Sequence, residues 1–469
     1  MSGQLDIAAR VLEQVAQRAG AGAEAEVTVE RAHLALTRFA NSYIHQNVAD
    51  DTTWVRLRLH TGGRTATVAT TLVDDAGLRT LADRVIEAAR VAPVDPSWPG
   101  LTAPAPAIGE AAYDEATATA SPAQRAERVK AFAAATGEAL AAGYCRTQHW
   151  QFAFANSAGQ ALASQGTEAA MDAIARYRGS DGVARLASPR LGDIDGARLG
   201  ASAAAKARAS VDAVELPPGR YEVVLEPYAV ADLLDNLASW GFNGRAHTER
   251  RSFVELGADQ LDSAVTIVDD PFGAGRPGFA FDREGTPARR MVLVDSGTCV
   301  AVTHDRRTAA LAGDGAASTG HALAHPFDAG PIAGNLELVA AAGQPATAAG
   351  QPVAVDQTGP ATAAAADLVA GLRRGLLVTD LSYTRVLDSK TLVMTGLTRN
   401  GVWLVEDGQV SKPVQNFRFT QSYPQALGPG AVNRIGATAT VLPLSWGVGW
   451  RTAPAVHLAG WNFTGGASG

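Results

Sequence analysis

The first 90 residues alternate between two hydrophobic periodicities. Apolar side chains recur every three or four positions in two segments, which is typical of amphipathic helices, and every second position in three others, which is typical of strands. Asp74 or Asp75 is placed to cap the second helix, and Gly62-Gly63 lies between the last two strands as a turn. The predicted helices are residues 5–19 and 75–89, and the predicted strands are 24–36, 54–60 and 65–70. Residues 1–91 are therefore predicted to form an α+β domain with an antiparallel sheet.

Residues 92–216 are predicted to begin with a proline-rich connector over 91–110 and to continue as a mixed helical and β segment. Ser121-Pro122 is a strong helix start, because serine is a good cap and proline fits the first helical position. A helix is expected from there to about residue 140, strands over 144–155 and 161–164, and an alanine-rich helix over 195–212.

The pattern from 217 to 469 indicates a β-rich C-terminal domain. A strand at 221–225 leads into a helix that begins at Pro227 and ends before Gly241. Short apolar runs at 264–268, 291–294 and 391–395 predict further strands. Asn400-Gly401 and Asp407-Gly408 are both typical of tight turns and predict two successive hairpins. The whole chain is thus predicted to be an α+β protein of three domains, 1–91, 92–216 and 217–469.

Charge and composition narrow the possible functions. The net charge of −7 argues against nucleic acid as the partner. No apolar run approaches the roughly 18 residues that a membrane helix needs, and the first residues do not have the pattern of a signal peptide. The only two cysteines, Cys145 and Cys299, favour a reduced compartment. We therefore expect a cytoplasmic protein with no membrane contact.

Three patterns could carry chemistry, and each has a simpler interpretation. Residues 273–278 match G-x-G-x-x-G, but no helical pattern follows, so a loop is favoured over a nucleotide site. His321 and His325 have the spacing of two metal ligands on a helix, and His304 or Asp305 could supply a third. Gly320 and Pro326 leave little room for that helix, so a polar loop is favoured. Four acids could perform acid–base chemistry if they were brought together, although solvated loop acids are the simpler expectation: Asp282, Glu284, Asp295 and Asp305.

Several segments resemble the TldD/PmbA family. The resemblance spans nearly the whole chain, and its specific blocks lie in the second half. These blocks are PPGRYEVVLEPYAVADLL at 217–234, FDREGTP at 281–287, STGHA at 318–322 and GVWLVEDG at 401–408, followed by Pro413-Val414.

The resemblance implies a cytoplasmic heterodimeric peptidase in which one subunit, of the TldD type, carries zinc on an H-E-x-x-x-H motif and a distant cysteine. In this chain Asp235 and Trp240 stand at the two histidine positions and Asn236 stands at the glutamate position. No cysteine follows Cys299. A catalytic zinc needs about three protein ligands, and an amide cannot accept a proton from attacking water. The chain is therefore similar to the TldE (PmbA) type of subunit, for which we expect no catalytic residue, metal or other cofactor in this chain.

The expected partner is a TldD-type subunit that holds the zinc, and the expected substrate is an unfolded peptide, in degradation or in the processing of ribosomally made precursors. A homodimer is conceivable when the partner is missing. Two alternatives remain open. The chain could be an autonomous metallohydrolase that uses His321, His325 and His304, or an interaction protein that modulates a topoisomerase.

Overall fold

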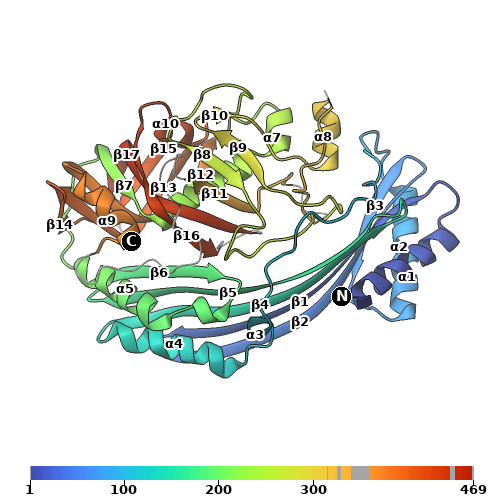
Figure 1. Cartoon of the computed structure of the whole chain (residues 1–469), viewed down its shortest axis with the longest axis horizontal. Coiled ribbons are helices and arrows are strands. Elements are labelled where there is room, and N and C mark those ends of the chain that lie inside the picture. Colours follow the sequence, from blue (N-terminus) through green and yellow to red (C-terminus); the bar gives the residue numbers. More distant parts are fainter. Residues whose placement is uncertain (1, 314, 325–328, 340–359, 444–448, 467–469) are drawn as a thin grey trace.

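The computed structural model describes residues 2–313, 315–324, 329–339, 360–443 and 449–466. Two sheets dominate the fold (Figure 1). The N-terminal sheet has six strands, of which four are long and curved, and the C-terminal half lies over its concave side. The predicted α+β class is confirmed.

The N-terminal sheet is antiparallel throughout, with the strand order β3-β2-β1-β4-β5-β6. Its strands are β1 (Glu24–Ala40), β2 (Tyr43–Thr61), β3 (Arg64–Thr70), β4 (Leu140–Asn156), β5 (Ala161–Tyr177) and β6 (Ser180–Ser188). Because β1 pairs with β4 from Glu26 to Phe39, one continuous sheet includes strands from both sides of the domain boundary predicted at 91/92. The division of the chain into three domains remains a prediction.

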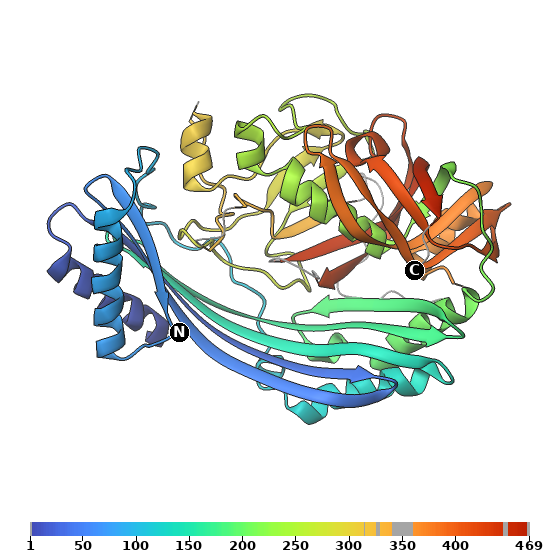
Figure 2. The same ribbon diagram turned by 180° about the vertical axis from the view of Figure 1, so that it is seen from behind.

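Helices cover the outer side of this sheet at both ends (Figure 2). They are α1 (Ser2–Arg18) and α2 (Asp75–Val91) at one end, and α3 (Glu115–Ala118), α4 (Pro122–Thr136), the short 3₁₀ turn η1 (Leu191–Asp193) and α5 (Gly196–Ala209) at the other. The predicted caps are present. Asp74 accepts a hydrogen bond from the amide of Gly77 at 2.7 Å, and Ser121 and Gln124 form a reciprocal capping box.

The C-terminal sheet has eleven strands, and five of them close into a ring, because β7 pairs with both β12 and β17. The ring consists of β7 (Gly219–Leu225), β12 (Arg374–Asp388), β13 (Val393–Glu406), β15 (Phe417–Ser422) and β17 (Trp450–Gly466). The remaining strands are β8 (Thr266–Asp269), β9 (Met291–Asp295), β10 (Thr298–Cys299), β11 (Asn335–Val339), β14 (Gln409–Pro413) and β16 (Val432–Pro443). Its helices are α6 (Pro227–Asn236), the π-helical turn η2 (Leu237–Gly241), α7 (Gly244–Thr248), α8 (Arg306–Ala312), α9 (Ala363–Ala370) and α10 (Tyr423–Ala426).

One of the two hairpins predicted near residue 400 is wrong. Asp407-Gly408 does turn β13 into β14, but Asn400-Gly401 lies inside β13. Here Val378 pairs with Val402 while Asp380 pairs with Arg399, so Asn400 and Gly401 together oppose Thr379. The positive φ angles that made this dipeptide suggest a turn, 59° and 129°, instead form a β-bulge.

A buried ionic cluster joins the two halves of the molecule. Arg58 on β2 donates to both Glu26 and Glu284 at 3.0 Å, and Arg306 at the start of α8 donates to the same two carboxylates. All four side chains are at most 8% exposed. The guanidinium groups of Arg58 and Arg306 also lie over the ring of Trp98, 4.7 and 5.5 Å from its centre. This cluster fixes the loop around Glu284 against the N-terminal sheet.

Within the part of the chain that the structure describes, no helix has the length and apolar character needed to cross a membrane.

Candidate functional site

A large cavity of about 1890 Å³ separates the concave N-terminal sheet from the C-terminal half. Strands β1, β2, β3, β5 and β6 contribute to one wall. The opposite side includes α6, η2, the β12–β13 pair, Arg451 on β17 and parts of the loops at 269–289, 320–324 and 329–334. Its lining includes Asp235, Asn236 and Trp240, the three residues at the positions where the resemblance places the zinc motif. The cavity is large enough to admit a peptide segment rather than only a small molecule.

The helix that bears these three positions is built by local sequence. Pro227 begins α6 directly after β7, and its apolar face packs into the C-terminal core through Val230, Leu233 and Leu234. The opposite face, with Asp232 and Asp235, borders the cavity. After Asn236 the chain widens into the π-helical turn η2, an irregularity that recurs at functional sites.

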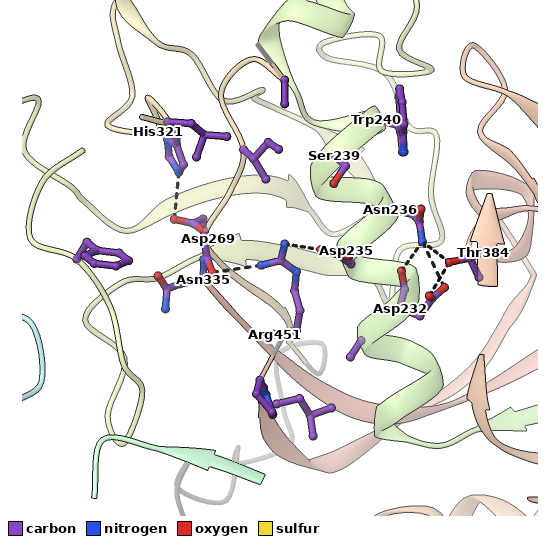
Figure 3. A pocket seen from close by; sticks show the side chains of 18 of the residues that line it. Asp232, Asp235, Asn236, Ser239, Trp240, Asp269, His321, Asn335, Thr384 and Arg451 are labelled. Atoms are coloured by element: carbon purple, nitrogen blue, oxygen red, sulfur yellow. Dashed lines mark hydrogen bonds and ion pairs between the residues drawn. The ribbon is translucent and has the colours of Figure 1, made fainter. Parts of the chain in front are cut away.

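Asp235 is engaged by an arginine from a distant strand (Figure 3). Nη2 of Arg451 on β17 donates to Oδ1 of Asp235 at 2.9 Å, and the two side chains are 1% and 39% exposed. Nη1 of Arg451 donates to the carbonyl oxygens of Trp450 at 3.0 Å and Gly334 at 3.2 Å. The negative charge of Asp235 is therefore balanced by the guanidinium of Arg451, a side chain of the same protein.

The other two motif positions carry none of the Cys, His or carboxylate ligands that zinc sites use. Nδ2 of Asn236 donates to the backbone oxygen of Asp232 at 2.9 Å, which leaves only a neutral amide oxygen as an acceptor. Trp240 has only a donor N–H. These three residues therefore do not fit a catalytic zinc site, since the one carboxylate among them is already paired with Arg451.

Asp232, one turn before Asp235, is a cavity residue that the sequence pattern did not single out. Its carboxylate accepts hydrogen bonds from Thr384 Oγ1 at 2.8 Å and Tyr423 Oη at 2.9 Å. Burial raises the pKa of Asp232 to about 7, because these bonds only partly offset the loss of hydration. The sequence could have pointed to Asp232 through its position on the polar face of the predicted helix. Arg451 gave no such signal, since it lies 216 residues from Asp235.

The structure describes two of the three candidate metal-binding histidines, while His325 lies outside the described residues. Nε2 of His321 lies 3.1 Å from Oδ2 of Asp269, and its Nδ1 lies 2.8 Å from the hydroxyl of Thr319. Nδ1 of His304 lies 3.2 Å from Thr308 Oγ1. Among the described residues, no three His, Cys, Asp or Glu side chains gather closely enough to hold a metal ion. A metal bound by these histidines remains a prediction, and the described residues do not offer it a complete set of ligands.

The four candidate acids do not form one group. Asp305 caps α8 by accepting from the amide of Thr308 at 2.7 Å, and Asp295 ends β9 in an exposed position. Asp282 and Glu284 are buried, which corrects the expectation of solvated loop acids. Burial raises the pKa of Asp282 to about 7, whereas Arg306 and Arg58 lower the pKa of Glu284 despite its burial. Their role in the loop is structural, because backbone amides and arginines occupy both carboxylates.

The G-x-G-x-x-G match is a loop, as expected, and the two cysteines are structural. The loop at residues 273–278 is followed by irregular chain, so it has no helix N-terminus for a pyrophosphate. Cys145 and Cys299 are both free and buried.

Comparisons with known proteins agree with this architecture. The sequence pattern of the PmbA/TldA metallopeptidase C-terminal domain matches residues 218–465, which is more than half of the chain. A metalloprotease of Methanothermobacter thermautotrophicus is 28% identical over 113 residues, and this match covers 24% of the chain and 25% of that relative. The chain thus aligns with only about a quarter of the length of this relative.

Solved structures match the fold over nearly its full length. TldE from Thermococcus kodakarensis has a TM-score of 0.83 at 17% identity, covering 98% of this chain and 100% of that one. A putative modulator of a DNA gyrase from Thermotoga maritima has a TM-score of 0.80 at 16% identity, covering 98% and 99%. A putative modulator of DNA gyrase from Bacteroides thetaiotaomicron has 0.80 at 18% identity, covering 99% of both. With its C-terminal domain matched in sequence and its whole fold matched in structure, the chain belongs to the PmbA/TldD family.

Proposed function

We propose that this chain is the non-catalytic, TldE-type subunit of a heterodimeric TldD–TldE zinc metallopeptidase. Its partner is a TldD-type subunit that supplies the zinc, and its substrate is an unfolded peptide. The reaction is degradation or the processing of ribosomally made precursors. The observation that carries the proposal is the pairing of Asp235 with Arg451 at the family's motif position. A guanidinium there satisfies the carboxylate and repels a second cation.

The cavity between the two sheets suits a subunit that forms one side of a closed chamber. It is lined by two separate parts of the chain, and the buried cluster of Glu26, Arg58, Glu284 and Arg306 holds those parts in a fixed relation. A rigid subunit of this kind would lend shape and substrate contacts to the zinc site of another chain. Such a complex would act in the cytoplasm, where the free cysteines remain reduced.

The test is reconstitution with the TldD-type chain of the same organism. The chain alone should contain far less than one zinc per molecule and should not cleave unfolded peptides, whereas the mixture should cleave them. Asp235→Asn keeps an oxygen that can accept from Arg451, so the complex should retain activity within about twofold. Loss of turnover in an assembled Asp235→Asn complex would contradict the non-catalytic role.

The same preparation distinguishes the alternatives. An autonomous metallohydrolase would bind about one metal ion without a partner and lose it in His321→Ala. A modulator of a topoisomerase would change supercoiling activity and would not activate a TldD-type chain.

A further inference from the structure

The cavity lining carries an excess of positive charge, opposite in sign to the chain as a whole. Among the lining residues that the structure describes, ten are arginine and seven are aspartate or glutamate, and lysine is absent. The whole chain has a net charge of −7. A concave, low-dielectric lining with an excess of one sign concentrates the field of that excess inside the cavity, where it outweighs the opposite charge of distant surfaces.

Three of these arginines have guanidinium groups without a partner among the described residues. Arg289 lies in the loop that follows β8, and Arg385 and Arg399 lie on the paired strands β12 and β13. All three are exposed and border the cavity, and none forms an ion pair or a side-chain hydrogen bond with the described part of the chain. Their hydrogen-bond donors are therefore available to a ligand.

A further pair of cavity arginines shares a single carboxylate. Glu30 lies 3.2 Å from Nη2 of Arg283 and 3.7 Å from Nη1 of Arg56. Burial, together with the repulsion of Arg283, lowers the pKa of Arg56. Nη1 of Arg283 is buried without a hydrogen-bond partner among the described residues. Two cations with one anion leave a second positive region on the opposite wall, since Arg56 belongs to the N-terminal sheet.

Some of the cavity's own acids do not contribute a full negative charge. Burial raises the pKa of both Asp232 and Asp282 to about 7, so each is partly protonated at neutral pH. Apolar contacts are available beside the free arginines. Tyr383 is 69% exposed, lies two residues from Arg385 and, like it, borders the cavity.

We propose that the cavity selects acidic peptides, whose Asp and Glu side chains pair with Arg289, Arg385 and Arg399 while the Arg56–Arg283 pair holds a further carboxylate. The inference rests on the proposed function, because it names the substrate class of the same chamber. Guanidinium groups suit this task, since they bind carboxylates through two parallel hydrogen bonds and remain charged at every physiological pH.

The test measures binding of fluorescein-labelled peptides to the purified chain by anisotropy. Three flexible peptides of equal length carry Glu, Gln or Lys at the same positions in a Gly/Ser background. We expect the Glu peptide to bind at least tenfold more tightly than the Gln peptide at low salt, and the difference to shrink as sodium chloride screens it. The Lys peptide should bind most weakly.

The variant Arg289→Gln/Arg385→Gln/Arg399→Gln should bind the Glu peptide at least fivefold more weakly and the Gln peptide unchanged. The matched control is Arg79→Gln/Arg84→Gln/Arg90→Gln, which removes the same charge from exposed positions of α2 away from the cavity. It should bind both peptides like the parent. Circular dichroism checks that both triple variants are folded.

Equal affinity for the Glu and Gln peptides, or no binding of any of the three, would overturn the proposal. Equal weakening by both triple variants would also overturn it, because net charge rather than the cavity would then be responsible. None of these results would touch the proposed function, which is judged by partner-dependent cleavage of unfolded peptides.

Discussion

Arg451 and Asp235 form an ion pair in which the two partners differ in exposure. The guanidinium of Arg451 is 1% exposed, whereas the carboxylate side chain of Asp235 is 39% exposed and opens on the cavity. The carboxylate can be rehydrated when its partner is lost, but the guanidinium cannot. The pair should therefore respond asymmetrically to substitution.

Asp235→Ala should destabilise the protein by about 2 kcal/mol, because Arg451 keeps its charge in a buried position without its carboxylate partner. The free energy of unfolding in urea measures this effect. The double variant Asp235→Ala/Arg451→Met should be more stable than Asp235→Ala with Arg451 intact. The single variant Arg451→Met completes the double-mutant cycle. If the losses of unfolding free energy in the two single variants add up to the loss in the double variant, the pair contributes no coupling energy.

Glu284→Gln should cost at least about 3 kcal/mol, since it breaks a fully buried network. Glu284 accepts from Arg58 Nη1 at 3.0 Å, from Arg306 Nε at 3.1 Å and from the Arg306 amide at 3.0 Å. A neutral amide weakens all three bonds and leaves two guanidinium groups with one remaining carboxylate.

The same substitution at Glu87, an exposed residue of α2, is the control and should change stability by less than about 0.5 kcal/mol. Urea unfolding and limited proteolysis of the connector at 91–110 report the outcome. A Glu284→Gln protein as stable as the Glu87→Gln control would refute the role of this cluster in joining the two halves.

Elements specified by nearby residues were predictable from the sequence, and those specified by distant pairing were not. The caps at Asp74 and Ser121 act within three residues, so their helices begin where the pattern indicates. Asn400-Gly401 has an equally strong local preference for a turn. That preference is overridden because β13 pairs with β12 on one side and β15 on the other.

The candidate site shows the same division. Asp235, Asn236 and Trp240 could be singled out from sequence, because the resemblance places the zinc motif on the helix that follows a recognisable strand. That assignment remains a prediction, although the structure does place all three residues on α6 and η2. The residues that determine what this site can bind could not be singled out in this way. Arg451 reaches Asp235 from a strand formed much later in the chain, and Tyr423 reaches Asp232 in the same way.

Gly401→Ala should destabilise the protein by more than about 3 kcal/mol. Gly401 has a φ of 129°, and a Cβ there would lie 2.0 Å from Cη2 of the buried Trp403. Gly63→Ala is the matched control, because Gly63 also has a positive φ, 71°, but a Cβ there would meet nothing within 4 Å. Its cost should be about 1 kcal/mol, from backbone strain alone. Similar losses in the two variants would contradict the bulge in β13.

The raised pKa of Asp232 predicts a pH dependence of stability with a definite sign. The pKa of Asp232 is about 7 in the folded protein, against 3.8 for an unperturbed aspartate, so between these values the folded state binds more protons than the unfolded state. The contribution is fully present below about pH 4 and is lost as the pH rises through 7. Its upper bound is about 4 kcal/mol, at 1.36 kcal/mol for each pKa unit.

Asp232→Asn should flatten this part of the profile, because an amide cannot titrate but can still accept from Thr384 and Tyr423 through its oxygen. Urea unfolding of the parent and the variant at several pH values from about 4.5 to 8 measures the difference. Asp282 titrates in the same range in both proteins, so only the difference between the two curves is assigned to Asp232. That difference should grow in favour of Asp232→Asn as the pH rises. Parallel curves would mean that Asp232 is ionised throughout, and the cavity would then carry one more negative charge at neutral pH.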